Sequence, residues 1–307
     1  MKNLISIFDL NYKDIWSIVS LAVRLKKGEN VGKNLNGKSL GLIFEKPSTR
    51  TSVSFSVAIH QLGAFPLMLD AQNMQRKRGE TIEDTAQTLS RYLDGVVIRA
   101  FRHEDVLEFA ASSGIPTISG LTDLEHPCQI LGDILTIVEK KNISAPAGLG
   151  RVKVAFIGDG NNVANSLLAA CALMGINFSL AAPKGYEPND EILKKSKQAA
   201  KQSGSQIVIT SDPRKAVVDA DVIYTDVWTS MGEESQYQKR LKVFKNYQVN
   251  SKLVEGAKKD CLIMHCLPAH RGEEITADVI DGEHSVIFDQ AENRLHIQKA
   301  ILLHLLG

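Results

Sequence analysis

Short apolar segments alternate with helix-like segments along most of this 307-residue chain, and that alternation restricts its fold more than any other feature. In the first half, the apolar segments are residues 39–44, 65–69, 95–100 and 115–119. Helix-like patterns lie between them at residues 50–62, 81–93 and 103–113. Continuous apolar runs indicate strands covered on both faces, and strands separated by helices indicate βαβ units. The first half is therefore predicted to form a mainly parallel sheet flanked by helices.

A second series of the same kind begins near residue 150. A helix is expected before it at residues 126–141, where Pro127 suits the first turn, and the polar segment 142–150 marks a boundary. Further strands are expected at residues 151–160, 177–183, 205–210, 221–226, 261–266 and 285–289. The last segment, residues 291–307, has the pattern of an amphipathic helix.

The chain is long enough for two domains. We expect an α/β protein with two lobes, each with a mainly parallel sheet flanked by helices. The first lobe spans residues 1–140 and the second 150–289, and the C-terminal helix, about residues 290–307, packs back on the first. Ligands of open parallel sheets bind beyond the carboxyl ends of the strands. The active site is therefore expected in the cleft between the lobes.

Composition disfavours several classes of partner and compartment. The formal net charge is +1, so no overall field would recruit nucleic acid or an anionic membrane. The four cysteines contain no CxxC pair, which argues against a disulfide framework or a structural zinc site. The N-terminal segment lacks the apolar stretch of a signal peptide, and no apolar run approaches the roughly 20 residues that span a bilayer. These features favour a cytoplasmic protein.

Ser48, Thr49, Arg50 and Thr51 place three hydroxyl groups around one arginine, at the start of a predicted helix. Ser and Thr are common helix caps and a surface arginine is often only solvated, so a structural role is one interpretation. The alternative is an anion site, because a helix N-terminus offers unpaired N–H groups and a guanidinium matches phosphate. No GxxxxGK[ST] segment occurs, so a nucleoside triphosphate is not the expected ligand.

Other polar residues follow predicted strands or open predicted helices, and each has a structural alternative. Arg99 ends an apolar strand, where it either points beyond the strand end or lies on the surface. His126 and Gln129 stand at a helix start, and the histidine suits a cap or an oxyanion donor better than a zinc ligand, since further ligands with suitable spacing are missing. Asp226 and Ser230 lie after a strand and either bind an ammonium group or are ordinary loop residues.

Cys266 ends an expected strand, and a structural thiol is the default interpretation. A thiol at a strand end would instead face the cleft, where His265, His270 and Arg271 would favour the thiolate. The basic run at residues 75–80 is typical of a solvated face, above all at its second and third positions.

The segment IGDGNNVANS, residues 157–166, follows a strand and opens a helix, which raises the alternative of a dinucleotide site. Val163 occupies the place of the third glycine in that fingerprint, so nicotinamide binding is disfavoured. Asn161 and Asn162 either cap the helix or face the cleft and bind a polar substrate.

Taken together, these segments resemble the aspartate/ornithine carbamoyltransferase family over essentially the whole chain. The resemblance rests on FEKPSTRT, RGETIEDTA, VVIRA, HPCQ, GDGNNVANS, DVWTSMG, HCLPAHRGEEI and FDQAENR. It implies an enzyme that transfers the carbamoyl group of carbamoyl phosphate to an amine, and DVWTSMG favours ornithine over aspartate as acceptor. The implied products are citrulline and phosphate, as in arginine biosynthesis.

The resemblance also implies which residues bind each substrate. Residues 1–140 would form the carbamoyl-phosphate-binding domain and residues 150–289 the ornithine-binding domain. The residues implied for carbamoyl phosphate are Ser48, Thr49, Arg50, Thr51, Gln75, Arg99, His126, Pro127, Cys128, Gln129, Cys266, Leu267 and Arg294. The residues implied for ornithine are Asn162, Asp226, Ser230 and Met231.

Catalytic roles are implied for Arg99, His126 and Cys266. Arg99 and His126 would stabilise the oxyanion that forms when the amine attacks the carbonyl, and Cys266 would accept the proton of the amine. No metal ion or organic cofactor is implied. The resemblance further implies a homotrimer in which Gln75 reaches a neighbouring subunit's site.

Two places depart from the family pattern. Ser52 stands where an arginine is usual, and Arg76 and Lys77 stand where a leucine and a glycine are common. These departures concern loop geometry and affinity more than the type of reaction. Alternative functions are carbamoyl transfer to putrescine or to an N-acylated ornithine, nicotinamide-dependent dehydrogenation, and a silent paralogue that regulates a partner.

Overall fold

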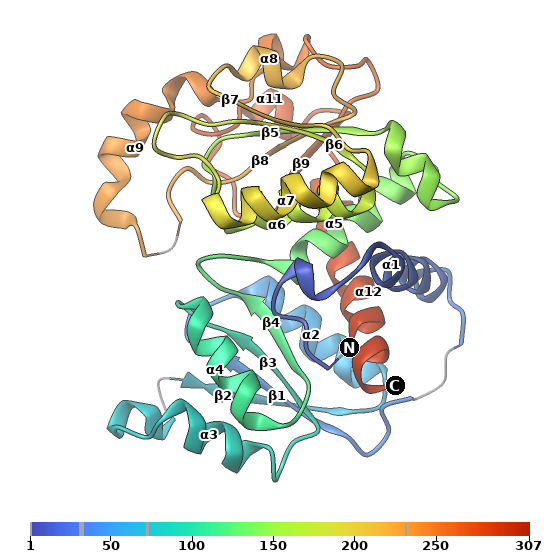
Figure 1. Ribbon diagram of the computed structural model, residues 1–307, viewed down its shortest axis with the longest axis vertical. Coiled ribbons are helices and arrows are strands. Elements are labelled where there is room, and N and C mark those ends of the chain that lie inside the picture. The colour runs from blue at the N-terminus through green and yellow to red at the C-terminus, as the bar shows by residue number, and fades with distance from the viewer. Residues whose placement is uncertain (1, 31–33, 72–73, 231) are drawn as a thin grey trace. The chain divides into compact units, whose positions relative to one another are not determined.

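The structure, a computed structural model, describes residues 2–30, 34–71, 74–230 and 232–307 (Figure 1). The chain divides into two compact units, one formed by Met1–Leu135 with Glu292–Gly307 and the other by Thr136–Ala291. Among the helices that the structure describes, none combines the length and the apolar character needed to cross a bilayer.

The first unit contains a parallel sheet with the strand order β2-β1-β3-β4. Its strands are β1 (Ser39–Phe44), β2 (Phe65–Asp70), β3 (Gly95–Arg99) and β4 (Thr117–Leu121). Its helices are α1 (Tyr12–Lys26), α2 (Thr49–Gln61), α3 (Ile82–Leu89), α4 (His103–Ser113) and parts of α5 (Pro127–Lys140) and α12 (Ile287–Leu306). Helices α3 and α4 cover one face of the sheet, and α2 and α12 cover the other (Figure 1).

Burial on both faces explains why these strands are apolar throughout. Val96 and Ile98 of β3 pack in one cluster with Val106 and Phe109 of α4. Val97 points to the opposite face, because successive strand side chains alternate, and it is also fully buried. A strand in this position therefore has no polar face.

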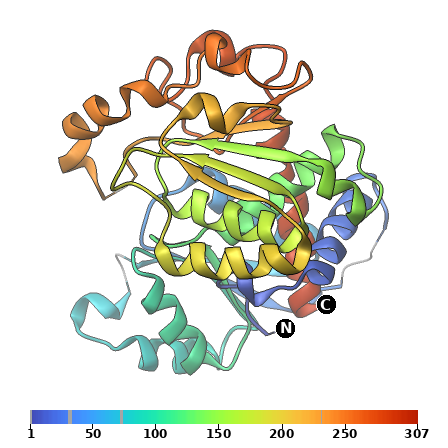
Figure 2. The same cartoon turned by 45° about the horizontal axis from the view of Figure 1, so that its top comes forward.

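The second unit contains a parallel sheet with the strand order β7-β6-β5-β8-β9. Its strands are β5 (Lys153–Ile157), β6 (Asn177–Ala181), β7 (Ile207–Thr210), β8 (Val222–Thr225) and β9 (Leu262–His265). Its helices include α6 (Asn162–Met174), α7 (Asp190–Ser203), α8 (Pro213–Val217), α9 (Tyr237–Phe244), α10 (Ser251–Val254) and α11 (Ala277–Ile280). Helices α6 and α7 lie together on one face, and α8 and α11 on the other (Figures 1 and 2).

Each sheet has a point where the direction of chain progression reverses between neighbouring strands. In the first unit this point lies between β1 and β3, whose carboxyl ends pair through Phe44 and Arg99. In the second it lies between β5 and β8, which pair there through Ile157 and Thr225. Open α/β sheets bind ligands at such points. Several of the predicted site residues follow these four strand ends.

Gly160, one of the two glycines after β5, has a packing explanation. A Cβ on Gly160 would lie 2.3 Å from backbone atoms of Glu187 and Pro188, so only glycine fits there. Asn161 caps α6, because its Oδ1 accepts hydrogen bonds from the N–H groups of Val163 and Ala164. The turn therefore needs its glycine whether or not a dinucleotide binds.

The predicted architecture of two helix-flanked parallel sheets is confirmed, but one expected strand is wrong. Ser285 forms only an isolated bridge with Ile263, and α12 begins at Ile287. The apolar run at 285–289 contains buried Val286 and Ile287, and this burial belongs to the entry of a helix rather than to a strand. The helices expected from the sequence include no counterpart of α1, α7, α8, α9, α10 or α11. In α7 the reason is a narrow buried face of Ile192, Ser196 and Ala200, two of them small.

Candidate functional site

Four basic side chains of the first unit gather near the carboxyl ends of β1 and β3. Arg50 lies in the first turn of α2, Arg99 ends β3, His126 precedes α5, and Arg294 belongs to α12. Arg99, His126 and Arg294 are 6%, 4% and 3% exposed. All three guanidinium groups are close enough to act electrostatically on His126. We call these four residues the basic cluster.

His126 is the uncharged member of the basic cluster. Burial lowers its pKa well below the ordinary value of 6.5, and the positive charges of Arg294, Arg99 and Arg50 lower it further. A neutral imidazole donates one hydrogen bond and accepts another. The cluster therefore places a neutral polar group inside a strongly positive environment, which suits a ligand that joins a polar group to an anion.

The hydroxyl groups at the start of α2 have different environments. Thr51 is fully buried, and its Oγ1 accepts a hydrogen bond of 2.6 Å from Nη2 of Arg294. The capping interpretation of Ser48 is confirmed, since its Oγ accepts from the Thr51 N–H at 3.3 Å. A capping hydroxyl keeps its own proton to donate, so the cap does not exclude an anion. Thr49 is exposed.

The first turn of α5 carries Pro127, Cys128 and Gln129. Cys128 is fully buried, its thiol donates to the Ser119 carbonyl at 3.3 Å, and burial raises its pKa to about 12. Gln129 Nε2 donates to Asp133 Oδ1 at 2.9 Å. Gln129 Oε1 is buried and has no hydrogen-bond partner among the described residues, so it remains an acceptor for a ligand.

The basic run after β2 forms a short 3₁₀ helix, Gln75–Arg78. Gln75 is exposed, and the side chain of Lys77 lies outside the described residues. The expectation that Arg76 is merely solvated is wrong. Its guanidinium lies 2.6 Å from Glu45 and 3.4 Å from Asp105, and so connects this helix to the segment between β1 and α2 and to α4.

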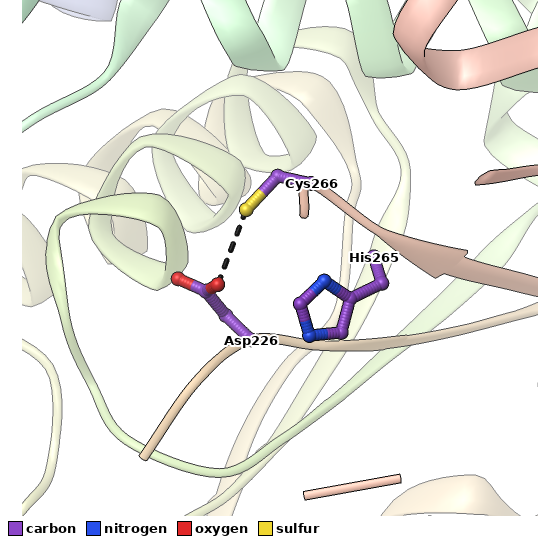
Figure 3. Close-up of side chains that lie close together, drawn as sticks. All are labelled: Asp226, His265 and Cys266. Atoms are coloured by element: carbon purple, nitrogen blue, oxygen red, sulfur yellow. Dashed lines mark hydrogen bonds between the residues drawn. The ribbon is translucent and has the colours of Figure 1, made fainter. Parts of the chain in front are cut away.

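In the second unit, Asp226 lies at the centre of the predicted residues. This buried carboxylate follows β8, and the Cys266 thiol donates to its Oδ1 at 3.1 Å (Figure 3). Asn161 Nδ2 donates to its Oδ2 at 2.8 Å. Asn162 is half-buried in the first turn of α6. Asn161, which the sequence left undecided between cap and ligand, caps the helix and also contacts Asp226.

His265 is fully buried next to Cys266 and is fixed as a neutral imidazole. The Leu267 N–H donates to Nδ1 at 2.9 Å, so the proton sits on Nε2, which lies 3.1 Å from Glu274 Oε1. The expectation that His265 supplies positive charge to the thiol is therefore wrong. The group that the thiol contacts is a carboxylate, Asp226.

Asp226, His265 and Cys266 form one of two groups of possible metal ligands among the described residues, and His270, Glu273 and Glu274 form the other. The ligand atoms of the first group lie within 4.8 Å of one another, and Figure 3 shows the three side chains together. Both ring nitrogens of His265 are already engaged, by Leu267 and by Glu274. Metal binding would have to break one of these buried hydrogen bonds, which is unfavourable.

The remaining predicted ornithine residues lie after β8. The Ser230 N–H donates to Glu233 Oε2 at 3.2 Å, and Met231 lies outside the described residues.

Asp159, which is buried after β5, was not predicted from the sequence. Burial raises its pKa to about 6, although Arg240 lies 2.7 Å away and acts in the opposite direction. A carboxylate between two glycines at a strand end was the available signal.

The depressed pKa of His126 predicts a specific dependence of stability on pH. Below about pH 6.5 the unfolded chain binds a proton on His126 that the folded chain does not. The stability present above pH 6.5 is therefore lost as the pH falls toward the folded-state pKa. In His126→Gln the free energy of unfolding should therefore fall less steeply below pH 6.5 than in wild type. The difference in slope should be up to about 1.4 kcal/mol per pH unit. Denaturant unfolding of both proteins between pH 5 and pH 8 measures it.

The comparison between wild type and variant cancels the other histidines whose pKa burial lowers, His103 and His296. Parallel curves of unfolding free energy against pH would show that His126 titrates normally in the folded protein.

Two domains of one family match the chain. The aspartate/ornithine carbamoyltransferase carbamoyl-P binding domain matches residues 2–139, and the Asp/Orn binding domain of the same family matches residues 151–305.

Relatives match over the full length. An ornithine carbamoyltransferase of Methanosphaera stadtmanae is 54% identical over 305 residues, which cover 99% of each chain. The anabolic ornithine carbamoyltransferase of Pyrococcus furiosus is 50% identical over 100% of this chain and 96% of its own.

Solved structures of ornithine carbamoyltransferases are similar as well. That of Pyrococcus furiosus is 49% identical with a TM-score of 0.93, covering 100% of this chain and 97% of its own. The anabolic enzyme of Campylobacter jejuni is 40% identical with a TM-score of 0.94, covering 99% of each chain.

Proposed function

The chain belongs to the aspartate/ornithine carbamoyltransferase family, and on that premise we propose that it transfers the carbamoyl group of carbamoyl phosphate to the side-chain amine of L-ornithine. The products are L-citrulline and phosphate, and the direction is that of arginine biosynthesis. The observation that carries the proposal is the basic cluster, in which the charges of three guanidinium groups act on a buried, neutral histidine.

The phosphate of carbamoyl phosphate binds at the basic cluster. Arg50, Arg99 and Arg294 neutralise its charge, and guanidinium groups match its oxygens in geometry as well as charge. The first turn of α2 adds its N–H groups and the positive end of the helix dipole. The hydroxyl groups of Ser48, Thr49 and Thr51 complete the set.

The carbamoyl group lies against the first turn of α5. Its carbonyl oxygen accepts a hydrogen bond from His126, and its NH₂ group donates to Oε1 of Gln129, which is an unused acceptor. Backbone groups of Pro127 and Cys128 add further contacts. This role needs only the backbone of Cys128, consistent with a thiol that is buried and bonded to a carbonyl.

Ornithine binds to the second unit. The Asp226 carboxylate pairs with the α-ammonium group, and Asn162 binds the α-carboxylate. Ser230 and Met231 complete the set. Cys266 and Leu267 follow β9, where they contact both substrates.

The reaction needs a neutral amine and a stabilised oxyanion. With a lysine-like pKa near 10.4, only about one amine in 2,500 is neutral at pH 7. The amine forms a bond to the carbamoyl carbon, the charge on the carbonyl oxygen is stabilised by Arg99, His126 and Thr51, and the bond to the phosphate oxygen then breaks. Cys266, in its thiolate form, takes the proton that the amine releases.

A homotrimer is the assembly that we propose, with Gln75 reaching a neighbouring subunit's site. The edge strand β2 supports association, because Phe65 and Met68 are 62% and 48% exposed and Val53 of α2 is also exposed.

We place the enzyme in the cytoplasm. All four cysteines lie within the described residues and none forms a disulfide, which fits a reducing compartment.

The proposal is tested by measuring ureido-product formation from carbamoyl phosphate at pH 8, with one acceptor at a time. Ornithine should be carbamoylated, whereas putrescine, N-acetylornithine and aspartate should not. Turnover with one of the other acceptors would keep the phosphate site but overturn the assignment of ornithine. No turnover with any acceptor would contradict the enzymatic activity and indicate a protein that only binds its ligands.

Arg50→Ala should strongly weaken carbamoyl phosphate binding, since it removes a charged contact to a phosphate group. The expected loss is about 2–5 kcal/mol, or roughly a factor of 30 or more in the dissociation constant. Isothermal titration calorimetry measures it. Arg91→Ala, which removes the same charge from an exposed position, is the matched control. Equal affinities of the two variants would contradict the assignment of the phosphate site to the start of α2.

Cys266→Ala should leave carbamoyl phosphate binding within a few-fold of wild type but lower kcat and raise the KM for ornithine. Cys266→Ser is the informative companion, because a hydroxyl can still donate to Asp226 but does not ionise near neutral pH. The serine variant should recover ornithine affinity without recovering kcat, and the wild-type rise in kcat from pH 7 toward pH 9 should flatten. Kinetics like those of wild type in both variants would make Cys266 a structural thiol.

A further inference from the structure

Arg240 lies in α9, outside every group of predicted site residues, yet it is only 5% exposed. Its guanidinium makes three contacts of the same length. Nη1 donates to Asp159 Oδ2 and to the Trp228 carbonyl, each at 2.7 Å, and Nη2 donates to Glu233 Oε1 at 2.7 Å. One buried side chain thus connects the turn after β5, the loop after β8 and α9 itself.

The surroundings of Arg240 are complete enough to hold it in one orientation. Its Cζ lies 5.0 Å from the centre of the Tyr186 ring, a distance at which a cation is attracted to an aromatic face. A buried charge is tolerated only where it is paired and hydrogen-bonded, and Arg240 has two carboxylates. Such a pair contributes little net stability compared with apolar residues, so its value lies in fixing geometry.

The geometry that Arg240 fixes is that of the loop after β8, residues 226–230 and 232–234 in the described part, which we call the β8 loop. Arg240 holds the backbone of this loop at Trp228, two residues after Asp226. It holds Glu233 through Oε1, and Glu233 Oε2 accepts from the Ser230 N–H at 3.2 Å. Ser230 is therefore held by Glu233, and the backbone two residues before it is held at Trp228. Both contacts lead to the guanidinium of Arg240.

The same guanidinium fixes the other part of the ornithine site. Asp159 is followed by Gly160, which packs against the backbone of Glu187, and then by Asn161. Asn161 in turn donates to Asp226 at 2.8 Å. The two segments that carry the predicted ornithine residues are thus held in register by Arg240 on one side and by the Asn161–Asp226 contact on the other.

We propose that Arg240, acting through Glu233 and Asp159, is a positioning residue that sets the affinity for the amino-acid acceptor by holding the β8 loop against the turn after β5. The inference rests on the proposed function for the identity of the acceptor. Arg240 touches no reacting atom. Its effect should appear in the KM for ornithine and leave the carbamoyl phosphate site unchanged, because the basic cluster belongs to the other unit.

Glu233→Gln is the first variant, because its side chain is 34% exposed and the change should not prevent folding. An amide can still accept from Arg240 through its oxygen, but its NH₂ group cannot accept from the Ser230 N–H. Arg240→Lys is the second, since an ammonium group on a flexible stem cannot replace a planar fork with three partners. Glu255→Gln, the same change at an exposed glutamate of this unit, is the control.

Steady-state kinetics should show the KM for ornithine raised about tenfold in Glu233→Gln and more in Arg240→Lys, as expected for loss of hydrogen bonds to charged groups. The KM for carbamoyl phosphate should stay within twofold of wild type, and the control should match wild type throughout. An unchanged KM for ornithine in both variants, or an equal loss in both KM values and kcat, would overturn the positioning role.

Hydrogen exchange of the enzyme without substrate tests the same role independently of turnover. The Ser230 amide should exchange faster in Glu233→Gln and Arg240→Lys, whereas amides of α6 should keep their protection. Unchanged exchange at Ser230 would contradict the inference. Absence of wild-type turnover with ornithine would instead overturn the proposed function, and the exchange result would still decide whether Arg240 holds the loop.

Discussion

The positive charges of Arg50, Arg99 and Arg294 all act on the buried imidazole of His126, and the proposed phosphate site depends on that convergence of charge. The arrangement persists because rigid elements impose it: Arg99 ends a fully buried strand, Arg50 lies in the first turn of a helix, and Arg294 is held by Thr51. His126 accommodates the field by remaining neutral. A dianion would be attracted by all three guanidinium groups, and electrostatic binding energy is largest where charge is prearranged in a site of restricted solvent access.

At the matching place in its sheet the second unit carries two buried aspartates, of which Asp159 is paired with Arg240. Asp226 and Asp159 follow the strands on either side of the reversal point, and each has hydrogen-bond donors around it. One parallel sheet therefore presents cations beyond its strand ends and the other presents carboxylates. That difference suits one substrate that is a phosphate and another that carries an ammonium group, which is the pair that the proposed reaction requires.

The sequence predicted what depends on local pattern. All but one of the strands expected from apolar runs are present. The Ser48 cap and the proline at the start of α5 could be predicted from residue type alone. The strand expected at 285–289 failed because a short apolar run fits a buried helix entry equally well. The ion pairs of Arg76 and Arg240 could not be predicted, because their partners, Glu45 and Asp159, are distant in sequence and an arginine in a polar segment has no local signature.

The most direct test of the account is whether the basic cluster binds an anion at all. The thermal unfolding midpoint of the protein should be measured in increasing inorganic phosphate, with chloride keeping the ionic strength constant. A ligand that binds only the folded state raises the midpoint with the logarithm of its concentration once the site is saturated. The account predicts such a rise, and equal midpoints in phosphate and in chloride would contradict it.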